Sequence, residues 1–167
     1  MSTNRESNAS VSRVEGLELI MERFFVAPRE LVFDMFVNPE HIVNWWGPHG
    51  WTTTNYQMDI RPGGVWHYCM RSEEDGTEAW GKAVYEEIVK PERLVYTDSF
   101  SDDKGNNVDG MPIIKVISEF FEEGNGTKII SRSLFETKEE LQRVLDMGVV
   151  EGMDETFDRL DGYLNLQ

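Results

Sequence analysis

The longest segment with a regular helical period is TKEELQRVLDMGVVEGMDETFDRLDGYL, residues 137–164. Thr137 and Glu140 form a T-x-x-E capping box, which predicts that a helix begins here. Apolar residues then recur at steps of three and four, the period of one helix face. These residues are Leu141, Val144, Met147, Val150, Met153, Phe157, Leu160 and Leu164. The pattern predicts one long helix, spanning roughly 40 Å, whose apolar stripe another layer must cover.

Two glycines, Gly148 and Gly152, lie four residues apart within this predicted helix. Each costs about 1 kcal/mol relative to alanine in a helix interior. Two explanations stay open: the glycines thin one wall of a cavity, or they let another segment approach closely. The other side of the helix is acidic, which is typical of a solvated face.

The rest of the chain predicts one strand, two short helices and then six strands. Residues 17–26 form the first strand, Pro28 opens the first helix, and Asn38-Pro39 separates it from a second that ends near Trp45. The six later strands are expected over residues 52–60, 65–71, 77–89, 93–100, 112–121 and 127–135. Short turns between consecutive strands indicate an antiparallel meander, and strands followed by a helix indicate an α+β fold. We therefore predict a curved sheet wrapped around the C-terminal helix.

Length and composition favour one domain over residues 17–167, with residues 1–16 as a disordered tail rich in serine and asparagine. The net charge of −15 argues against nucleic acid and anionic membrane surfaces as partners. No apolar run is long enough to span a membrane. The single cysteine, Cys69, excludes an internal disulfide and fits a cytoplasmic location.

Several short strings, in order along the chain, also resemble a known family. They are Ala27-Pro28, Asn38-Pro39-Glu40-His41, Trp45-Trp46-Gly47-Pro48, Asp59-x-Arg61-Pro62-Gly63-Gly64-x-Trp66, Gly81 with Glu87-Ile88, Pro91-Glu92-Arg93-Leu94, Gly126-Thr127, and Met147-Gly148 with Glu151-Gly152. Together they resemble the START-like (SRPBCC) superfamily, in the branch similar to the C-terminal domain of the heat-shock protein 90 ATPase activator. The resemblance implies a helix-grip fold, in which a curved sheet and a C-terminal helix enclose an apolar cavity.

Aromatic and methionine side chains are the candidates for the cavity lining. Trp66, Tyr68 and Met70 alternate onto one face of their predicted strand. Rings with a polar tip suit a ligand pocket, although the same residues can equally fill a core. The candidates are Trp45, Trp46, Trp66, Tyr68, Met70, Trp80, Tyr96, Met147, Met153 and Phe157.

No catalytic residue, metal site or cofactor is predicted. His41, His49 and His67 lack the spacing of zinc ligands, and His67 falls on the strand face opposite the expected cavity. Cys69 has no nucleophile motif around it, and no phosphate-binding glycine motif occurs.

The leading hypothesis is therefore a non-enzymatic protein that binds a small hydrophobic molecule or lipid between sheet and helix. The alternative, implied by the resemblance, is a co-chaperone domain of the stress response that contacts a heat-shock chaperone ATPase. A third hypothesis is a cyclase or hydrolase working inside the cavity, which requires a histidine, aspartate or glutamate directed into it.

Overall fold

The computed structural model describes residues 9–167, and a single antiparallel sheet dominates it. Its eight strands lie in the order β1-β2-β8-β7-β6-β5-β4-β3. They are β1 (Val11–Glu15), β2 (Glu18–Phe25), β3 (Trp51–Met58), β4 (Val65–Ser72), β5 (Glu78–Val89), β6 (Arg93–Phe100), β7 (Ile113–Glu123) and β8 (Gly126–Leu134). From β3 to β8 each strand pairs with the next one along the chain, which confirms the predicted meander.

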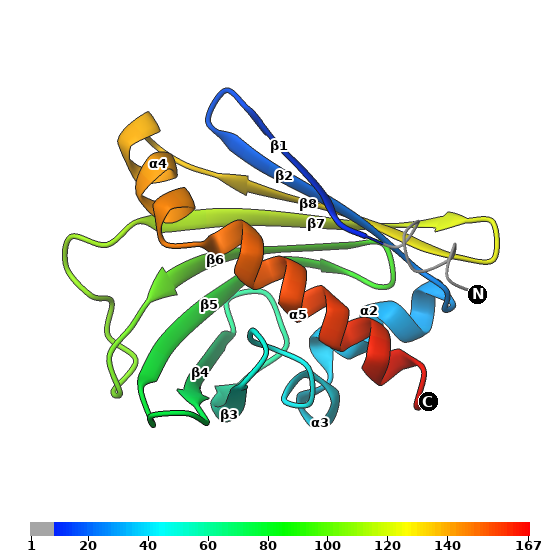
Figure 1. Ribbon diagram of the computed structural model, residues 1–167, viewed down its shortest axis with the longest axis horizontal. Helices are drawn as coiled ribbons and strands as arrows, with labels where there is room; N and C mark the ends of the chain where they lie inside the picture. The colour runs from blue at the N-terminus through cyan, green and yellow to red at the C-terminus, as the bar shows by residue number, and fades with distance from the viewer. Residues whose placement is uncertain (1–8) are drawn as a thin grey trace.

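The described residues form four helices, which occupy the concave side of the sheet (Figure 1). They are α2 (Arg29–Val37), α3 (Pro39–Ile42), α4 (Lys138–Asp146) and α5 (Val149–Leu164). The two short helices follow β2 as predicted, and the Asn38 side chain caps α3 by accepting a hydrogen bond from the Glu40 amide at 3.0 Å. The α+β helix-grip fold predicted from the sequence is confirmed.

Two β-bulges help the sheet to curl around α5. The pairing register shifts by one residue between Asn55 and Gln57 in β3, and again between Tyr85 and Glu87 in β5. An extra residue in one strand bends it and increases its twist. Both bulges lie close to the short helices: the Asn55 side-chain amide donates to the Pro39 carbonyl oxygen at 3.4 Å, and Tyr85 belongs to the core cluster that contains Phe36 and Ile42.

The buried side chains form two clusters rather than one. The larger cluster joins α2, α3 and α5 to the middle of the sheet, and Trp45, Phe25 and Phe33 are fully buried in it. The smaller cluster joins α4 to β2 and the end of β8 through Leu19 and Leu141, among others. Each long helix therefore has its own patch of sheet to cover.

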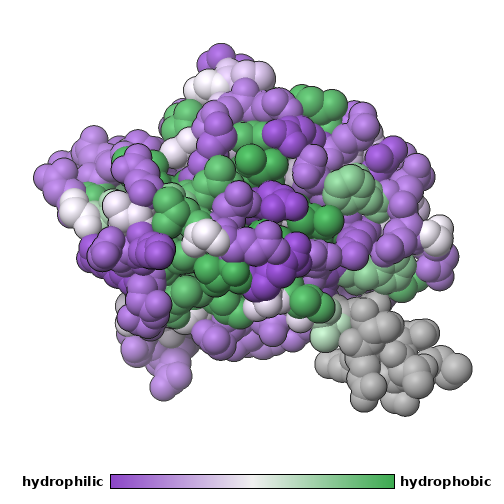
Figure 2. All heavy atoms as spheres, turned by 90° about the horizontal axis from the view of Figure 1, so that it is seen from above, coloured by the Kyte–Doolittle hydropathy of each residue, from purple (hydrophilic) through white to green (hydrophobic). Residues whose placement is uncertain are grey.

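The N-terminal segment differs from the prediction. Val11–Glu15 forms strand β1, paired with β2, so the prediction of disorder over residues 1–16 is wrong for this part; residues 1–8 lie outside the described residues. All five residues of β1 are exposed, so the strand needs no apolar alternation, and its polar sequence resembles that of a tail. Arg13 ties it to its partner strand through Glu22, at 2.6 Å. The surface seen from above is mainly hydrophilic, with separate hydrophobic patches (Figure 2).

The predicted single long helix is two helices. Its start is confirmed, because Thr137 Oγ1 accepts a hydrogen bond from the Glu140 amide at 3.1 Å. The helix then breaks at Gly148, whose φ of +87° is left-handed, and α5 begins at the next residue. A left-handed glycine commonly ends a helix, since the absence of a Cβ removes the steric cost. Both helices cover the same sheet, so their apolar residues continue one stripe across the break. The spacing of these residues therefore gives no sign that the helix is interrupted.

Replacing Gly148 with alanine is expected to lower the free energy of unfolding by about 1–2 kcal/mol, the cost of a left-handed conformation for a residue with a Cβ. The space around the position is not the reason, because the nearest atom to an added Cβ is Glu151 Oε1, at 3.7 Å. Urea unfolding followed by circular dichroism would measure the change.

The matched control is Gly162→Ala, inside α5, where an added Cβ meets nothing within 4 Å. Relief of the poor helix propensity of glycine should there raise the free energy of unfolding by up to about 1 kcal/mol. Equal stabilisation by both substitutions would contradict the left-handed assignment of Gly148.

Candidate functional site

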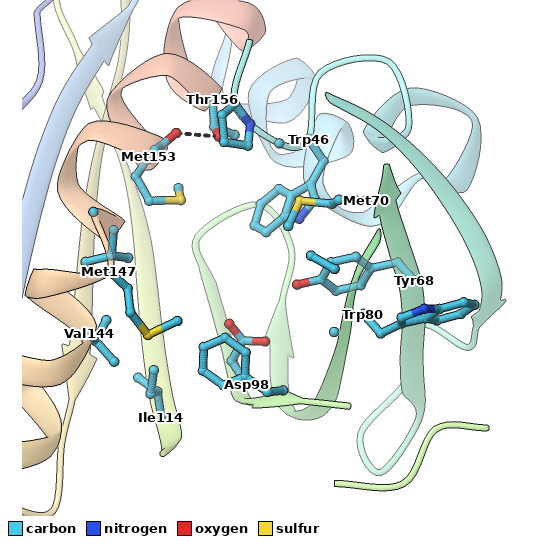
Figure 3. Close-up of a pocket in the computed structure, with 18 of the residues that line it drawn as sticks. Trp46, Tyr68, Met70, Trp80, Asp98, Ile114, Val144, Met147, Met153 and Thr156 are labelled. Atoms are coloured by element: carbon cyan, nitrogen blue, oxygen red, sulfur yellow. Dashed lines mark hydrogen bonds between the residues drawn. The ribbon is translucent and has the colours of Figure 1, made fainter. Parts of the chain in front are cut away.

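A cavity of about 300 Å³ lies between the sheet and the helix pair, beside the break at Gly148. Strands β4 to β7 form one wall and the two long helices form the other (Figure 3). The sheet contributes Tyr68, Met70, Ala79, Gly81, Asp98 and Ile114, and the helices contribute Val144, Met147, Val149, Met153 and Thr156. The loop before β3 adds Trp46, Gly47 and Pro48. Most of these side chains are apolar, and Asp98 is the only carboxylate among them.

Six of the ten residues proposed from the sequence border this cavity. They are Trp46, Tyr68, Met70, Trp80, Met147 and Met153. The Trp80 ring lies on the outer face of the sheet, where it stacks on His67 with ring centroids 5.2 Å apart and is tilted against Tyr56 at 4.7 Å. Alternation explains this, because the next residue, Gly81, faces inward. Figure 3 shows the Trp80 ring beyond Tyr68, on the far side of the strand.

The other four candidates lie outside the cavity, so the expectation that they line it is not met. Trp45 is fully buried in the core, where its indole N–H donates to the Met35 carbonyl oxygen at 3.2 Å. Phe157 packs edge-on against Phe25 in the same core cluster. Trp66 and Tyr96 border a separate void of only about 10 Å³ further along the sheet. Strand alternation gave the correct face for these two residues but not their position along the sheet.

The aromatic part of the wall is held rigidly by its neighbours. The rings of Trp66 and Tyr68 stack at 4.2 Å, and Trp46 meets both edge-on. The Tyr68 ring lies directly over Gly81 of the neighbouring strand, where an added Cβ would come within 2.5 Å of the ring. Glycine at this position therefore makes room for the tyrosine ring.

The loop that carries Trp46 is fixed by Arg159, a residue that the sequence analysis did not single out. One guanidinium nitrogen, Nη1, donates to the carbonyl oxygens of Gly47 at 2.9 Å, Trp51 at 3.0 Å and Pro48 at 3.2 Å. Gly47 and Pro48 lie in the loop before β3 and Trp51 is the first residue of β3, so the arginine ties this loop to the start of the strand. Arg159 is the only basic residue in α5, and this was the available signal in the sequence.

The site also contains a functional candidate that the sequence reasoning missed, Asp98. It lies on β6, directly between Ala83 of β5 and Ile114 of β7, and its carboxyl group points into the cavity (Figure 3). The side chain is half-buried by its accessible surface, and desolvation by its mainly apolar surroundings raises the pKa of Asp98 from 3.8 to about 7. The sequence feature that could have identified Asp98 is strand alternation, which places it on the same inward face as Tyr96 and Phe100.

Asp98 is the one group of the cavity that changes charge near neutral pH. Burial raises the pKa values of the neighbouring Tyr68, Tyr85 and Tyr96, so these hydroxyls stay neutral. Among residues 9–167, no side chain forms an ion pair with Asp98, and no group of three or more histidine, cysteine or acidic residues could hold a metal ion. The cavity can thus offer one carboxyl group to a bound molecule, as a hydrogen-bonding or ion-pairing partner.

The pH dependence of stability should reveal this carboxyl group. The pKa of Asp98 is higher in the folded than in the unfolded state. Its contribution to the free energy of unfolding is therefore fully present below about pH 4 and is lost as the pH rises through 7. Asp98→Asn removes the titration, so between about pH 5 and pH 8 the variant should gain about 2 kcal/mol or more relative to the unchanged protein. Urea unfolding at a series of pH values would measure the difference.

Asp103→Asn is the matched control, because Asp103 is an exposed aspartate in the loop after β6. Its stability curve should run parallel to that of the unchanged protein. Parallel curves for Asp98→Asn as well would show that the carboxyl group at position 98 is not buried in the folded state.

Comparison with known proteins places this geometry in a family. The family described as Activator of Hsp90 ATPase homolog 1-like protein matches residues 26–165. None of the curated proteins matches the chain. Within residues 9–167, no helix combines the length and the apolar character needed to cross a membrane.

Solved structures agree with the family match. Protein Ms6760 from Mycobacterium smegmatis is 28% identical, with a TM-score of 0.86 over 92% of this chain and 95% of that one. A protein from Arthrobacter aurescens is also 28% identical, with a TM-score of 0.87 over 94% of this chain and 92% of that one. CalU16 from Micromonospora echinospora, 18% identical with a TM-score of 0.60 over 93% of this chain and 83% of that one, shares the fold. The chain therefore belongs to the Activator of Hsp90 ATPase homolog 1-like family, within the START-like (SRPBCC) superfamily.

Proposed function

We propose that this protein binds a small, mainly apolar molecule in the cavity between the sheet and the α4–α5 pair, without catalysing a reaction on it. The observation that carries the proposal is the cavity itself, about 300 Å³ with mostly apolar walls. A space of this size lies at the lower end of the range for small-molecule sites.

The composition of the walls supports a hydrophobic ligand. Burying apolar surface contributes about 25 cal/mol for each Å² removed from water. On the helix side of the cavity, Met147 and Met153 have flexible side chains that adapt to differently shaped ligands. The aromatic wall opposite them is rigid, so one side of the cavity is adaptable and the other is preformed.

Access to the cavity is best explained by the break between the helices. Met147 borders the cavity and is 53% exposed, so this side chain lies at a boundary with solvent. The adjacent Gly148 interrupts the helical hydrogen bonds between α4 and α5. A small displacement of α4 would widen the opening without disturbing α5.

A chaperone partner, the alternative considered from the sequence, is supported by the description of the family alone. Asp98 meets the requirement of an acidic residue directed into the cavity, but among residues 9–167 no histidine, cysteine, lysine or arginine borders the cavity to act with it. Ligand binding therefore accounts for more of the observed geometry than either alternative.

Filling the cavity should abolish binding. Ala79 borders the cavity and pairs directly with Met70, so both side chains lie on the inner face. Ala79→Trp places a large ring in this space and should weaken binding of the neutral dye N-phenyl-1-naphthylamine at least about tenfold, since the apolar volume is no longer free. The gain in dye fluorescence on titration with protein measures this affinity.

The control is Lys82→Trp, which adds the same ring to the same strand. Lys82 pairs with His67, on the outer face, so dye binding should be preserved. Lack of dye binding by the unchanged protein, or equal binding by Ala79→Trp and Lys82→Trp, would contradict a ligand site in the cavity.

A further inference from the structure

The cavity contains a negative charge without a counterion. Asp98 is ionised above about pH 7, yet the residues that line the cavity include no lysine, arginine or histidine. Charges inside proteins are normally paired, because desolvation of an isolated charge is costly. A ligand that supplies the missing positive charge would remove this cost.

Three basic residues on neighbouring elements, Lys115, Arg143 and Arg159, are engaged elsewhere. On β7, the ammonium group of Lys115 pairs with Glu86 at 3.2 Å. On α4, Arg143 donates to the Gly110 carbonyl oxygen at 2.8 Å. On α5, Arg159 holds the carbonyl groups of the loop before β3. None of these three side chains is free to neutralise Asp98.

Two further features of the site favour a cation. Tyr68 borders the cavity beside Asp98, and its hydroxyl oxygen can accept a hydrogen bond from an ammonium group. In Figure 3 the Tyr68 hydroxyl and the Asp98 carboxyl group both point into the same space. The net charge of −15 also attracts cations and repels anions over the whole surface.

We propose that the ligand is an apolar molecule that carries one protonated amine, and that this ammonium group forms an ion pair with Asp98. The inference rests on the proposed function and assigns a chemical class to the ligand. The apolar part of the molecule lies toward Met147 and Met153, on the helix wall opposite the carboxylate. Neutral molecules of the same shape bind more weakly, and anionic ones more weakly still.

The ionisable groups around Asp98 define the pH range of this preference. Tyr68 on β4, Tyr85 on β5 and Tyr96 on β6 stay neutral because their pKa values are raised, and the residues of α4 and α5 that line the cavity carry no charge. Aliphatic amines keep their proton up to about pH 10. The ion pair therefore forms best between about pH 7 and pH 10, and protonation of Asp98 weakens it at lower pH.

Three probes with one carbon skeleton test the proposal: 4-phenylbutylamine, 4-phenylbutan-1-ol and 4-phenylbutanoate. Their affinities would be measured at about pH 8 by displacement of N-phenyl-1-naphthylamine and by isothermal titration calorimetry. The amine should bind about 10- to 100-fold more tightly than the alcohol, as expected for a hydrogen-bonded charged group, and the carboxylate should bind least. Asp98→Asn should reduce the preference for the amine over the alcohol to about threefold or less, whereas Asp103→Asn should retain it.

The possible results separate this inference from the proposed function. Binding of the dye together with equal affinity for amine and alcohol would overturn the amine preference and leave the ligand site intact. The same conclusion would follow if the dye binds and none of the three probes displaces it, or if Asp98→Asn keeps the full preference. Failure of the dye and of all three probes to bind would overturn both proposals.

Discussion

The left-handed conformation of Gly148 is the constraint on which the arrangement of helices and sheet depends. A straight helix over residues 137–164 could not follow a sheet that curves beneath it. The break lets α4 pack against Leu19 and Phe135, and lets α5 pack over Phe25 and α2. The two helices leave the sheet uncovered where they meet, and the cavity lies at this point. The left-handed conformation of Gly148 therefore allows both helices to pack on the sheet and leaves the cavity between them.

The opposite wall depends on contacts between distant parts of the sequence. Arg159 near the C-terminus holds the loop that carries Trp46, and Gly81 makes room for Tyr68. These contacts order the aromatic rings before any ligand arrives. Under the proposed function, a preformed wall would reduce the entropy lost on binding and so favour affinity in a small cavity. The same order restricts which shapes fit between the rings and the helices.

Much of the fold could be predicted from the sequence because its signals are local. Turn residues and alternation located the strands, and the Thr137 capping box located the start of α4. The break at Gly148 could not be predicted, because apolar periodicity records the side that faces the sheet and not the backbone angles. Strand β1 was missed because an exposed edge strand is held by hydrogen bonds rather than by apolar side chains.

The candidate site was predicted less completely than the fold. Alternation identifies the inner face of a strand, so Tyr68 and Met70 were correctly placed at the cavity. It does not say how far along the sheet a cavity extends, so Trp66 and Tyr96 were placed there as well. Asp98 is one of 31 acidic residues, and only its three-dimensional surroundings distinguish it from the others.

The division of the core into two clusters has a consequence for how the molecule unfolds. Within residues 9–167, Met153 is the only side chain that packs against both clusters, and the cavity occupies the space beside it. A bound molecule would touch both clusters at once and act as a removable piece of the core. While the cavity is filled, the segment around α4 would unfold together with the rest of the protein. With the cavity empty, that segment could unfold separately.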